Sequence, residues 1–184
     1  MVLSLCTGAR RSELAALRWQ NIDFTRQTVR ISNSLTVSED GTLYDRPTKT
    51  SVERVVPLNG MALEALRAHR ARQNEERLRT GPAYQNDDRV FTDAFGQPWN
   101  PRSISNGFRR TAQAAKVNAR LHDLRHSCAT WLLQGGTDVR TVAAVLGHSN
   151  AVTTLTTYAH VMPGAQAQAV ERITDRLRPA AGEK

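Results

Sequence analysis

Lysine is nearly absent from this chain, which has only Lys49, Lys116 and Lys184 among its 184 residues. The formal charge of +8 at pH 7 therefore comes almost wholly from arginine. Because a guanidinium grips a phosphate with two parallel hydrogen bonds, nucleic acid is the first partner to consider. The alternative is an arginine-rich proteome encoded by a GC-rich bacterial genome, in which the charge has no special purpose.

Cysteine is also scarce, and long apolar runs are missing. Cys6 and Cys128 are too few for a disulfide framework, and we interpret both as small core residues in a reducing cytosol. The apolar opening, 1–6, is too short for a signal peptide, and no later stretch approaches the roughly 20 apolar residues that a membrane span requires. We therefore expect a cytoplasmic protein without membrane contact.

The composition fits one globular domain, since 40% of the residues are hydrophobic and can form a sizeable core. β-branched residues cluster or alternate at 28–31 and 52–56. Turn residues stand between them, at 38–41 and 47–50. This pattern predicts a small antiparallel three-stranded sheet, with Lys49 on a hairpin.

Helical signals dominate the rest of the chain, so we expect an α+β fold that is mainly α-helical. Ser12 or a neighbour is the expected cap of the first helix, and Asn59 and Asp138 are expected caps of later ones. Glycines mark several helix ends. The expected helices span about 12–18, 61–79, 102–116, 121–135, 138–145 and 164–178.

Two sets of residues suit the binding of an anion. His122 and Arg125 stand three apart on a predicted helix, so both side chains leave one face and reach a single small anion. Arg10 follows Gly8 by two residues, and the glycine allows a tight turn that points the guanidinium inward. The spacing alone does not distinguish an anion site from ordinary solvated surface charges in either set.

Four motifs resemble one known family. Their order and content are similar to the catalytic domain of the tyrosine recombinase (phage integrase) family, over about Thr7 to His160. A looser fifth motif, from Arg46 to Leu58, resembles the family's β-hairpin that carries a lysine. The four motifs are Thr7-Gly8-Ala9-Arg10-Arg11-Ser12-Glu13-Leu14, the run from His122 to Gly136, Leu146-Gly147-His148-Ser149, and Thr153-Thr154-Leu155-Thr156-Thr157-Tyr158-Ala159-His160.

The resemblance implies a site that breaks and rejoins DNA. Arg10 and Arg125 would bind the phosphate, and Glu13 would be a carboxylate that orients the site. Tyr158 would be the nucleophile, forming a 3′-phosphotyrosyl link that a 5′ hydroxyl of a partner strand then attacks. A phenol with a pKa of about 10 is mostly protonated at neutral pH, so His122 and the arginines would assist its deprotonation.

Three further residues complete the implied site. Lys49 would protonate the leaving 5′ oxygen, since nearby cations can lower the pKa of an ammonium; an exposed turn lysine is the competing interpretation. His148 would hydrogen-bond a nonbridging oxygen, although a Gly-His-Ser sequence is more often a helix end. We interpret His126 as a packing residue or one that orients the site.

No cofactor or metal is expected, because arginines and a lysine already supply the charge that Mg²⁺ brings in other nucleases. The expected partners are double-stranded DNA and further copies of the chain in a synaptic tetramer. The implied function is site-specific DNA recombination or integration, in a phage or another mobile genetic element.

Two other classes of protein compete with this interpretation. His122 and His126 stand four apart, as in zinc proteases, but the residue after the first is Asp123 rather than glutamate. The stronger rival is a non-catalytic DNA-binding module or an inactive integrase remnant, with 138–161 as a helix-turn-helix. In that rival Tyr158 is a core residue.

The chain departs from the family in length. Only six residues precede the first motif, where complete members carry the first catalytic helices and a core-binding domain. We therefore interpret 1–184 as a single catalytic domain without those parts, and we expect Leu3, Leu5 and Leu14 to be exposed. Residues 164–184 are expected to form a C-terminal helix and tail that packs in cis or on a neighbouring protomer.

Overall fold

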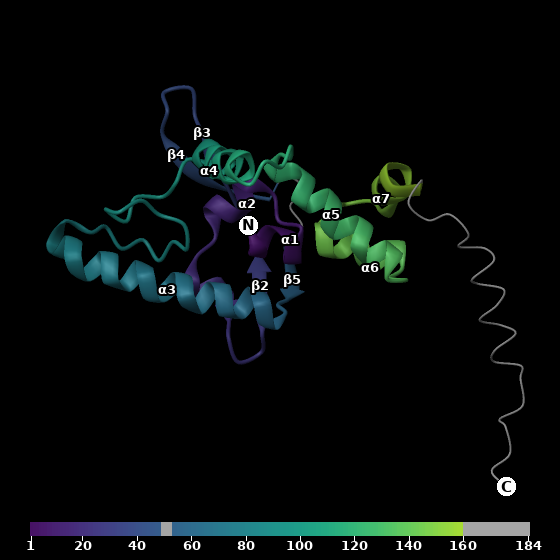
Figure 1. Ribbon diagram of the computed structural model, residues 1–184, viewed down its shortest axis with the longest axis horizontal. Coiled ribbons are helices and arrows are strands. Elements are labelled where there is room, and N and C mark those ends of the chain that lie inside the picture. Colours follow the sequence, from purple (N-terminus) through teal and green to yellow (C-terminus); the bar gives the residue numbers. More distant parts are fainter. Residues whose placement is uncertain (49–52, 160–184) are drawn as a thin grey trace, which may run out of the picture.

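Helices predominate in the fold, and the strands are short (Figure 1). A computed structural model describes residues 1–48 and 53–159. The expected α+β fold, mainly α-helical, is confirmed. The helices are α1 (Val2–Thr7), α2 (Arg11–Ala16), α3 (Gly60–Thr80), α4 (Pro101–Ala114), α5 (Leu121–Gln134), α6 (Val139–Leu146) and α7 (Ala151–Tyr158), and the strands are β1 (Ile22–Asp23), β2 (Thr28–Ile31), β3 (Asn33–Val37), β4 (Leu43–Pro47) and β5 (Arg54–Pro57).

A three-stranded antiparallel sheet with the order β1-β2-β5 contributes to the larger core, as predicted. Val29 of β2 lies opposite Ile22 of β1 and Val56 of β5, and all three are buried. The strands β3 and β4 form a separate two-stranded hairpin, which the sequence pattern did not separate from the sheet. Leu35 of β3 packs against Ala15 of α2, so the hairpin is anchored beside the start of the chain.

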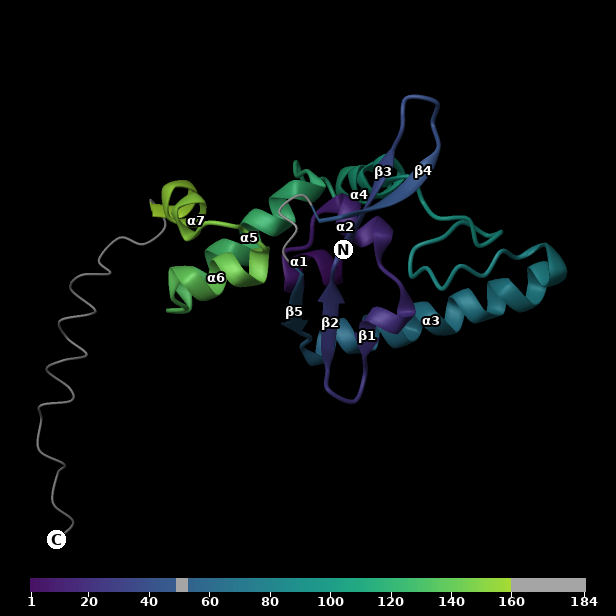
Figure 2. The same ribbon diagram turned by 180° about the vertical axis from the view of Figure 1, so that it is seen from behind.

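The long helix α3 lies beside the three-stranded sheet (Figure 2). Asn59 caps it as predicted, because its side chain accepts a hydrogen bond from the backbone N–H of Ala62. Leu63 and Leu66 pack into the core with the sheet residues, while most other side chains of the helix are exposed. The many charges of this segment therefore form a solvated face, as expected.

The helices α5, α6 and α7 form a second packed unit, seen at the right of Figure 1. Asp138 caps α6 as predicted, accepting hydrogen bonds from two backbone N–H groups of its first turn. Gly147 ends α6 in the left-handed conformation, with φ of 67°. The buried cluster that joins the three helices consists of Ala129, Leu133, Val142, Leu146 and Tyr158.

Two details near the start of the chain differ from the predictions. The cap position of α2 is Arg10 rather than Ser12, and the Glu13 carboxylate accepts the Arg10 backbone N–H. The expected exposure of Leu3 and Leu14 is wrong, because both pack in the core with the sheet and are only 6% and 4% exposed. Tertiary contacts with later parts of this same chain cover these side chains.

None of the helices in the described part of the chain is long and apolar enough to cross a membrane. Two predicted features lie outside the described residues. They are Lys49 and the C-terminal helix and tail at 164–184.

Candidate active site

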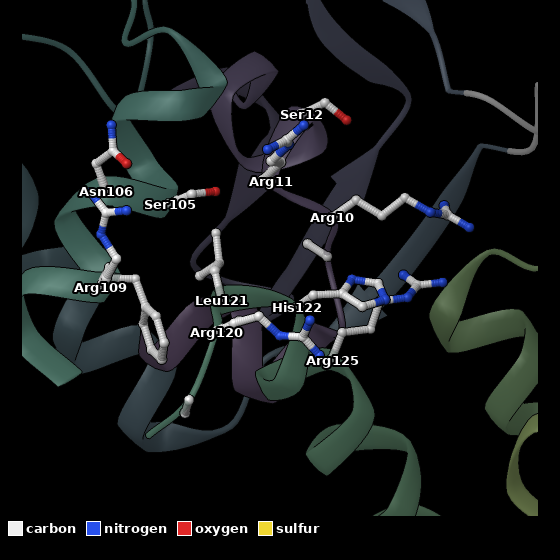
Figure 3. A pocket seen from close by; sticks show the side chains of 13 residues that line it. Arg10, Arg11, Ser12, Ser105, Asn106, Arg109, Arg120, Leu121, His122 and Arg125 are labelled. Atoms are coloured by element: carbon white, nitrogen blue, oxygen red, sulfur yellow. The ribbon is translucent and has the colours of Figure 1, made fainter. Parts of the chain in front are cut away.

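A cavity of about 510 Å³ lies between the start of α2, α4 and the start of α5 (Figure 3). Arg10, His122 and Arg125 line it, and their side chains extend toward the same end. The two guanidiniums that were predicted to hold a phosphate therefore share one cavity. Further positive charge along its wall comes from Arg11, Arg109 and Arg120.

Glu13 fixes the guanidinium of Arg10. Its carboxylate accepts hydrogen bonds from Arg10 Nη1 at 2.7 Å and from the Arg10 backbone N–H at 2.8 Å. Burial by itself raises the pKa of Glu13, but hydrogen bonds and charge from Arg54 and Arg10 bring that pKa below its ordinary value. Glu13 is therefore ionised at neutral pH and holds Arg10 at the edge of the cavity.

Arg125 is buried, with 3% of its surface exposed, and its Nη1 donates to the backbone carbonyl of Gly8. Its Nη2 is also buried and has no hydrogen-bond partner among the described residues. Burial, together with the nearby charge of Arg10, lowers the pKa of Arg125 to about 10, so the guanidinium stays charged at neutral pH. Because an unsatisfied buried donor costs about 1–3 kcal/mol, an anion at this atom would be strongly stabilising.

The conformation of Gly8 allows the contact with Arg125. Gly8 ends α1 with φ of 61°, and a Cβ at this position would lie only 2.5 Å from Leu146 Cδ2. Glycine adopts this conformation readily and leaves the required space. The end of α1 can therefore approach α6 closely and present its carbonyl oxygen to the guanidinium.

Arg54, at the start of β5, is a site residue that the sequence analysis missed. Its guanidinium donates to Glu13 Oε2 at 2.7 Å, and its Nε donates to the backbone carbonyl of Val145 at 2.8 Å. It therefore joins β5 to the carboxylate that holds Arg10 and to the end of α6. The alternation of residues in β5 could have revealed it, because it puts Arg54 on the same buried face as Val56. A charged side chain on a buried face needs a partner of opposite charge.

His148 follows the turn at Gly147, and its Nδ1 lies 2.7 Å from Thr154 Oγ1 of α7. Arg10 Nη2 reaches the carbonyl oxygen of Gly147 at 3.4 Å, which links this turn to the cavity. Burial, followed by the charges of Arg125 and Arg10, lowers the pKa of His148 to about 4. The ring is therefore neutral at neutral pH, and Nε2 is the atom that can contact an anion.

Tyr158 is the last residue of α7, and only 4% of its surface is exposed. Its hydroxyl lies 2.8 Å from Nδ1 of His126. His122, which the family resemblance implies as an aid to deprotonation of the phenol, contacts the ring of His126 edge-on, with 4.7 Å between ring centroids. Burial raises the pKa of Tyr158, and the charge of Arg125 opposes this rise.

The predicted residues thus fall into two linked groups. Arg10, His122 and Arg125 line the cavity, Tyr158 is hydrogen-bonded to His126, and the contact between the rings of His126 and His122 links the two groups. Within residues 1–48 and 53–159, no three His, Cys, Asp or Glu side chains are grouped so that they could hold a metal ion. The fold and the cavity together define a mainly helical domain with a cavity lined by arginine and histidine side chains.

Comparison with known proteins assigns the chain to a family. The model of the phage integrase family matches residues 1–164. A XerC-like tyrosine recombinase of Caldanaerobacter subterraneus subsp. tengcongensis is 34% identical over 188 residues, which cover 95% of this chain and 48% of that protein. The tyrosine recombinase XerC of Pediococcus pentosaceus is 36% identical over 157 residues, covering 84% of this chain and 46% of that protein. The chain therefore belongs to the phage integrase family.

A solved structure has a similar fold. The Tn1549 transposon integrase in complex with transposon right end DNA matches with a TM-score of 0.74 and 26% identity, covering 94% of this chain and 57% of that one. The chain spans about half the length of the curated relatives that it matches.

Proposed function

We propose that this chain is the catalytic domain of a site-specific DNA recombinase, which breaks and rejoins DNA through a 3′-phosphotyrosyl intermediate. Membership of the phage integrase family supports this class of reaction. The observation that carries the proposal is that Arg10 and Arg125 line the same cavity, and that Nη2 of Arg125 is a buried donor without a partner among the described residues. A nonbridging phosphate oxygen is the kind of acceptor that this donor lacks.

The two arginines act mainly in the transition state. Attack on a phosphodiester builds negative charge on the nonbridging oxygens, and donors fixed in advance stabilise this charge more than the ground state. Gly8 holds Arg125 and Glu13 holds Arg10, so little reorganisation is needed. Loss of either arginine is therefore expected to slow cleavage more than it weakens DNA binding.

The remaining residues have distinct roles in this proposal. Tyr158 is the nucleophile, and it lies close enough to Arg125 for the cation to act on its pKa. His122 and His148 donate hydrogen bonds to nonbridging oxygens; His148, with a pKa of about 4, does so as a neutral ring. Lys49 protonates the leaving 5′ oxygen. The phosphotyrosyl link conserves the energy of the broken bond, so strands exchange without a cofactor.

The proposed partners are double-stranded DNA and, on that DNA, further copies of the chain in a synaptic tetramer. The net charge of +8 supports DNA binding, as does the similarity to the Tn1549 transposon integrase, whose solved structure is a complex with transposon right end DNA. The proposed setting is a mobile genetic element in a bacterial cytoplasm. In this proposal, residues 1–184 act as one catalytic domain.

The experiment that tests the proposal uses a nicked suicide DNA substrate, from which the cleaved fragment diffuses away and prevents rejoining. We expect the protein to form a DNA adduct that survives denaturant. Tyr158→Phe should bind the same DNA but form no adduct, because it lacks the attacking oxygen. An adduct of undiminished yield with Tyr158→Phe would remove Tyr158 from the mechanism.

One observation favours the rival, a non-catalytic DNA-binding module. Tyr158 packs in the core cluster with 4% exposure, and α6 and α7 flank Gly147 as two short helices. In that case the wild-type protein binds DNA and forms no adduct, and Tyr158→Phe changes nothing. The same substrate therefore separates the two functions.

A further inference from the structure

The hydroxyl of Tyr158 contacts a residue whose role the family resemblance leaves open. Among the described residues its hydrogen-bond partner is Nδ1 of His126, at 2.8 Å. The ring centroids of the two residues are 5.7 Å apart. Because the tyrosine ring is held in the core cluster of α5, α6 and α7, its oxygen is directed at this histidine by packing.

The proton of this contact belongs to the phenol at neutral pH. Burial raises the pKa of Tyr158, so the hydroxyl is protonated and can donate. An imidazole nitrogen accepts such a bond when its lone pair is free and the other ring nitrogen carries the hydrogen. The geometry therefore presents a protonated nucleophile to a nitrogen that can take its proton.

His122 is placed for a different task. It lines the cavity with Arg10 and Arg125, whereas His126 is one helical turn further along α5, on the side of Tyr158. The rings of the two histidines meet edge-on with 4.7 Å between centroids, so the two residues are in contact. One histidine thus faces the site of the phosphate and the other faces the nucleophile.

We propose that His126 is a catalytic residue that accepts the phenolic proton as Tyr158 attacks DNA, an inference that rests on the proposed function. In this step the Tyr158 oxygen forms a bond to phosphorus and its proton moves to His126 Nδ1. The bond from phosphorus to the 5′ oxygen breaks, and that oxygen takes a proton from a general acid, for which Lys49 is proposed. In rejoining, the 5′ hydroxyl attacks phosphorus and returns its proton to the same general acid. The bond from phosphorus to the Tyr158 oxygen breaks, and the departing phenolate recovers its proton from His126.

The first test separates proton transfer from hydrogen bonding. His126→Asn keeps an acceptor oxygen near the position of Nδ1 but cannot take a proton, and His126→Leu removes the contact. We measure the single-turnover rate of adduct formation on the nicked substrate at saturating protein, together with DNA affinity. Because general base catalysis contributes about 10²–10⁴-fold, both variants should be slowed by at least about 100-fold with unchanged DNA affinity.

The second test uses the nucleophile itself. Ring-fluorinated tyrosine at position 158 has a lower phenol pKa and needs less help to lose its proton. It should therefore accelerate His126→Asn by a larger factor than it accelerates the protein with His126 intact. A purely structural role of His126 predicts the same factor in both backgrounds, and that result would overturn the proposal.

The outcomes also separate this inference from the function on which it rests. If the wild-type protein forms adduct and His126→Asn forms it at the same rate, only the role of His126 is wrong. If the wild-type protein forms no adduct, the recombinase function fails and the role of His126 fails with it. Thermal unfolding of each variant, compared with the wild type, identifies any rate loss that comes from misfolding.

Discussion

Replacing Arg54 by methionine should destabilise the protein strongly, because Arg54 belongs to a buried ion pair. Its side chain is 5% exposed and that of Glu13 is 1% exposed, with 2.7 Å between Arg54 Nη2 and Glu13 Oε2. Removing one partner of such a pair costs about 3–5 kcal/mol, since the other charge stays buried. The free energy of unfolding of a whole domain is only about 5–15 kcal/mol, so the loss is large.

The contacts of Glu13 decide where in this range each variant falls. In Arg54→Met, Glu13 keeps its two hydrogen bonds from Arg10, so we expect a loss near about 3 kcal/mol. In Glu13→Gln, the buried guanidinium of Arg54 loses its counter-charge, so we expect a loss near about 5 kcal/mol. At about 2–4 °C per kcal/mol, these losses lower Tm by about 6–12 °C and about 10–20 °C.

The measurement is urea unfolding, followed by tryptophan fluorescence, for the wild type and both variants; of the three tryptophans, Trp19 is buried and becomes exposed on unfolding. The same chain offers a matched control in the pair of Arg30 and Glu53, which has the same 2.7 Å separation but is 57% and 51% exposed. Arg30→Met should cost no more than about 1 kcal/mol. Equal losses for Arg54→Met and Arg30→Met would refute the reasoning, because burial would then have no effect.

Two further predictions concern groups at the site. Lys49→Ala should slow cleavage of ordinary DNA by about 10²-fold or more, because the leaving oxygen then lacks an acid. A substrate with sulfur at the bridging 5′ position, which leaves without protonation, should restore most of that rate in a single-turnover assay; no restoration would remove Lys49 from this role. The pKa of His148 is lowered to about 4 by burial and by the charges of Arg125 and Arg10, against an ordinary value of 6.5. As the pH falls from about 6.5 to about 4, the unfolded chain takes up a proton that the folded protein does not, so stability should fall over this window. His148→Asn should lose less stability over the same window in urea titrations, and parallel curves for the two proteins would contradict the assignment.

Local signals in the sequence predicted most of the secondary structure. Asn59 and Asp138 cap their helices as expected, and Gly147 ends α6, because such side-chain and backbone preferences act within one turn of helix. The cap of α2 was misassigned because Arg10 and Glu13 form a cap that uses a carboxylate from inside the helix. The exposure of Leu3 and Leu14 was also wrong, since no local signal shows what later segments cover.

The sequence by itself determined which residue types are present in the site, because the motifs near Arg10, Arg125, His148 and Tyr158 could each be recognised separately. Only the tertiary structure decided their partners. It set Arg54 of β5 against Glu13 of α2, and it brought the Tyr158 hydroxyl to His126 rather than to His122. These pairs are 41 and 32 residues apart in the chain, and the packing of α5, α6 and α7 against α1 and the sheet determines which side chains meet.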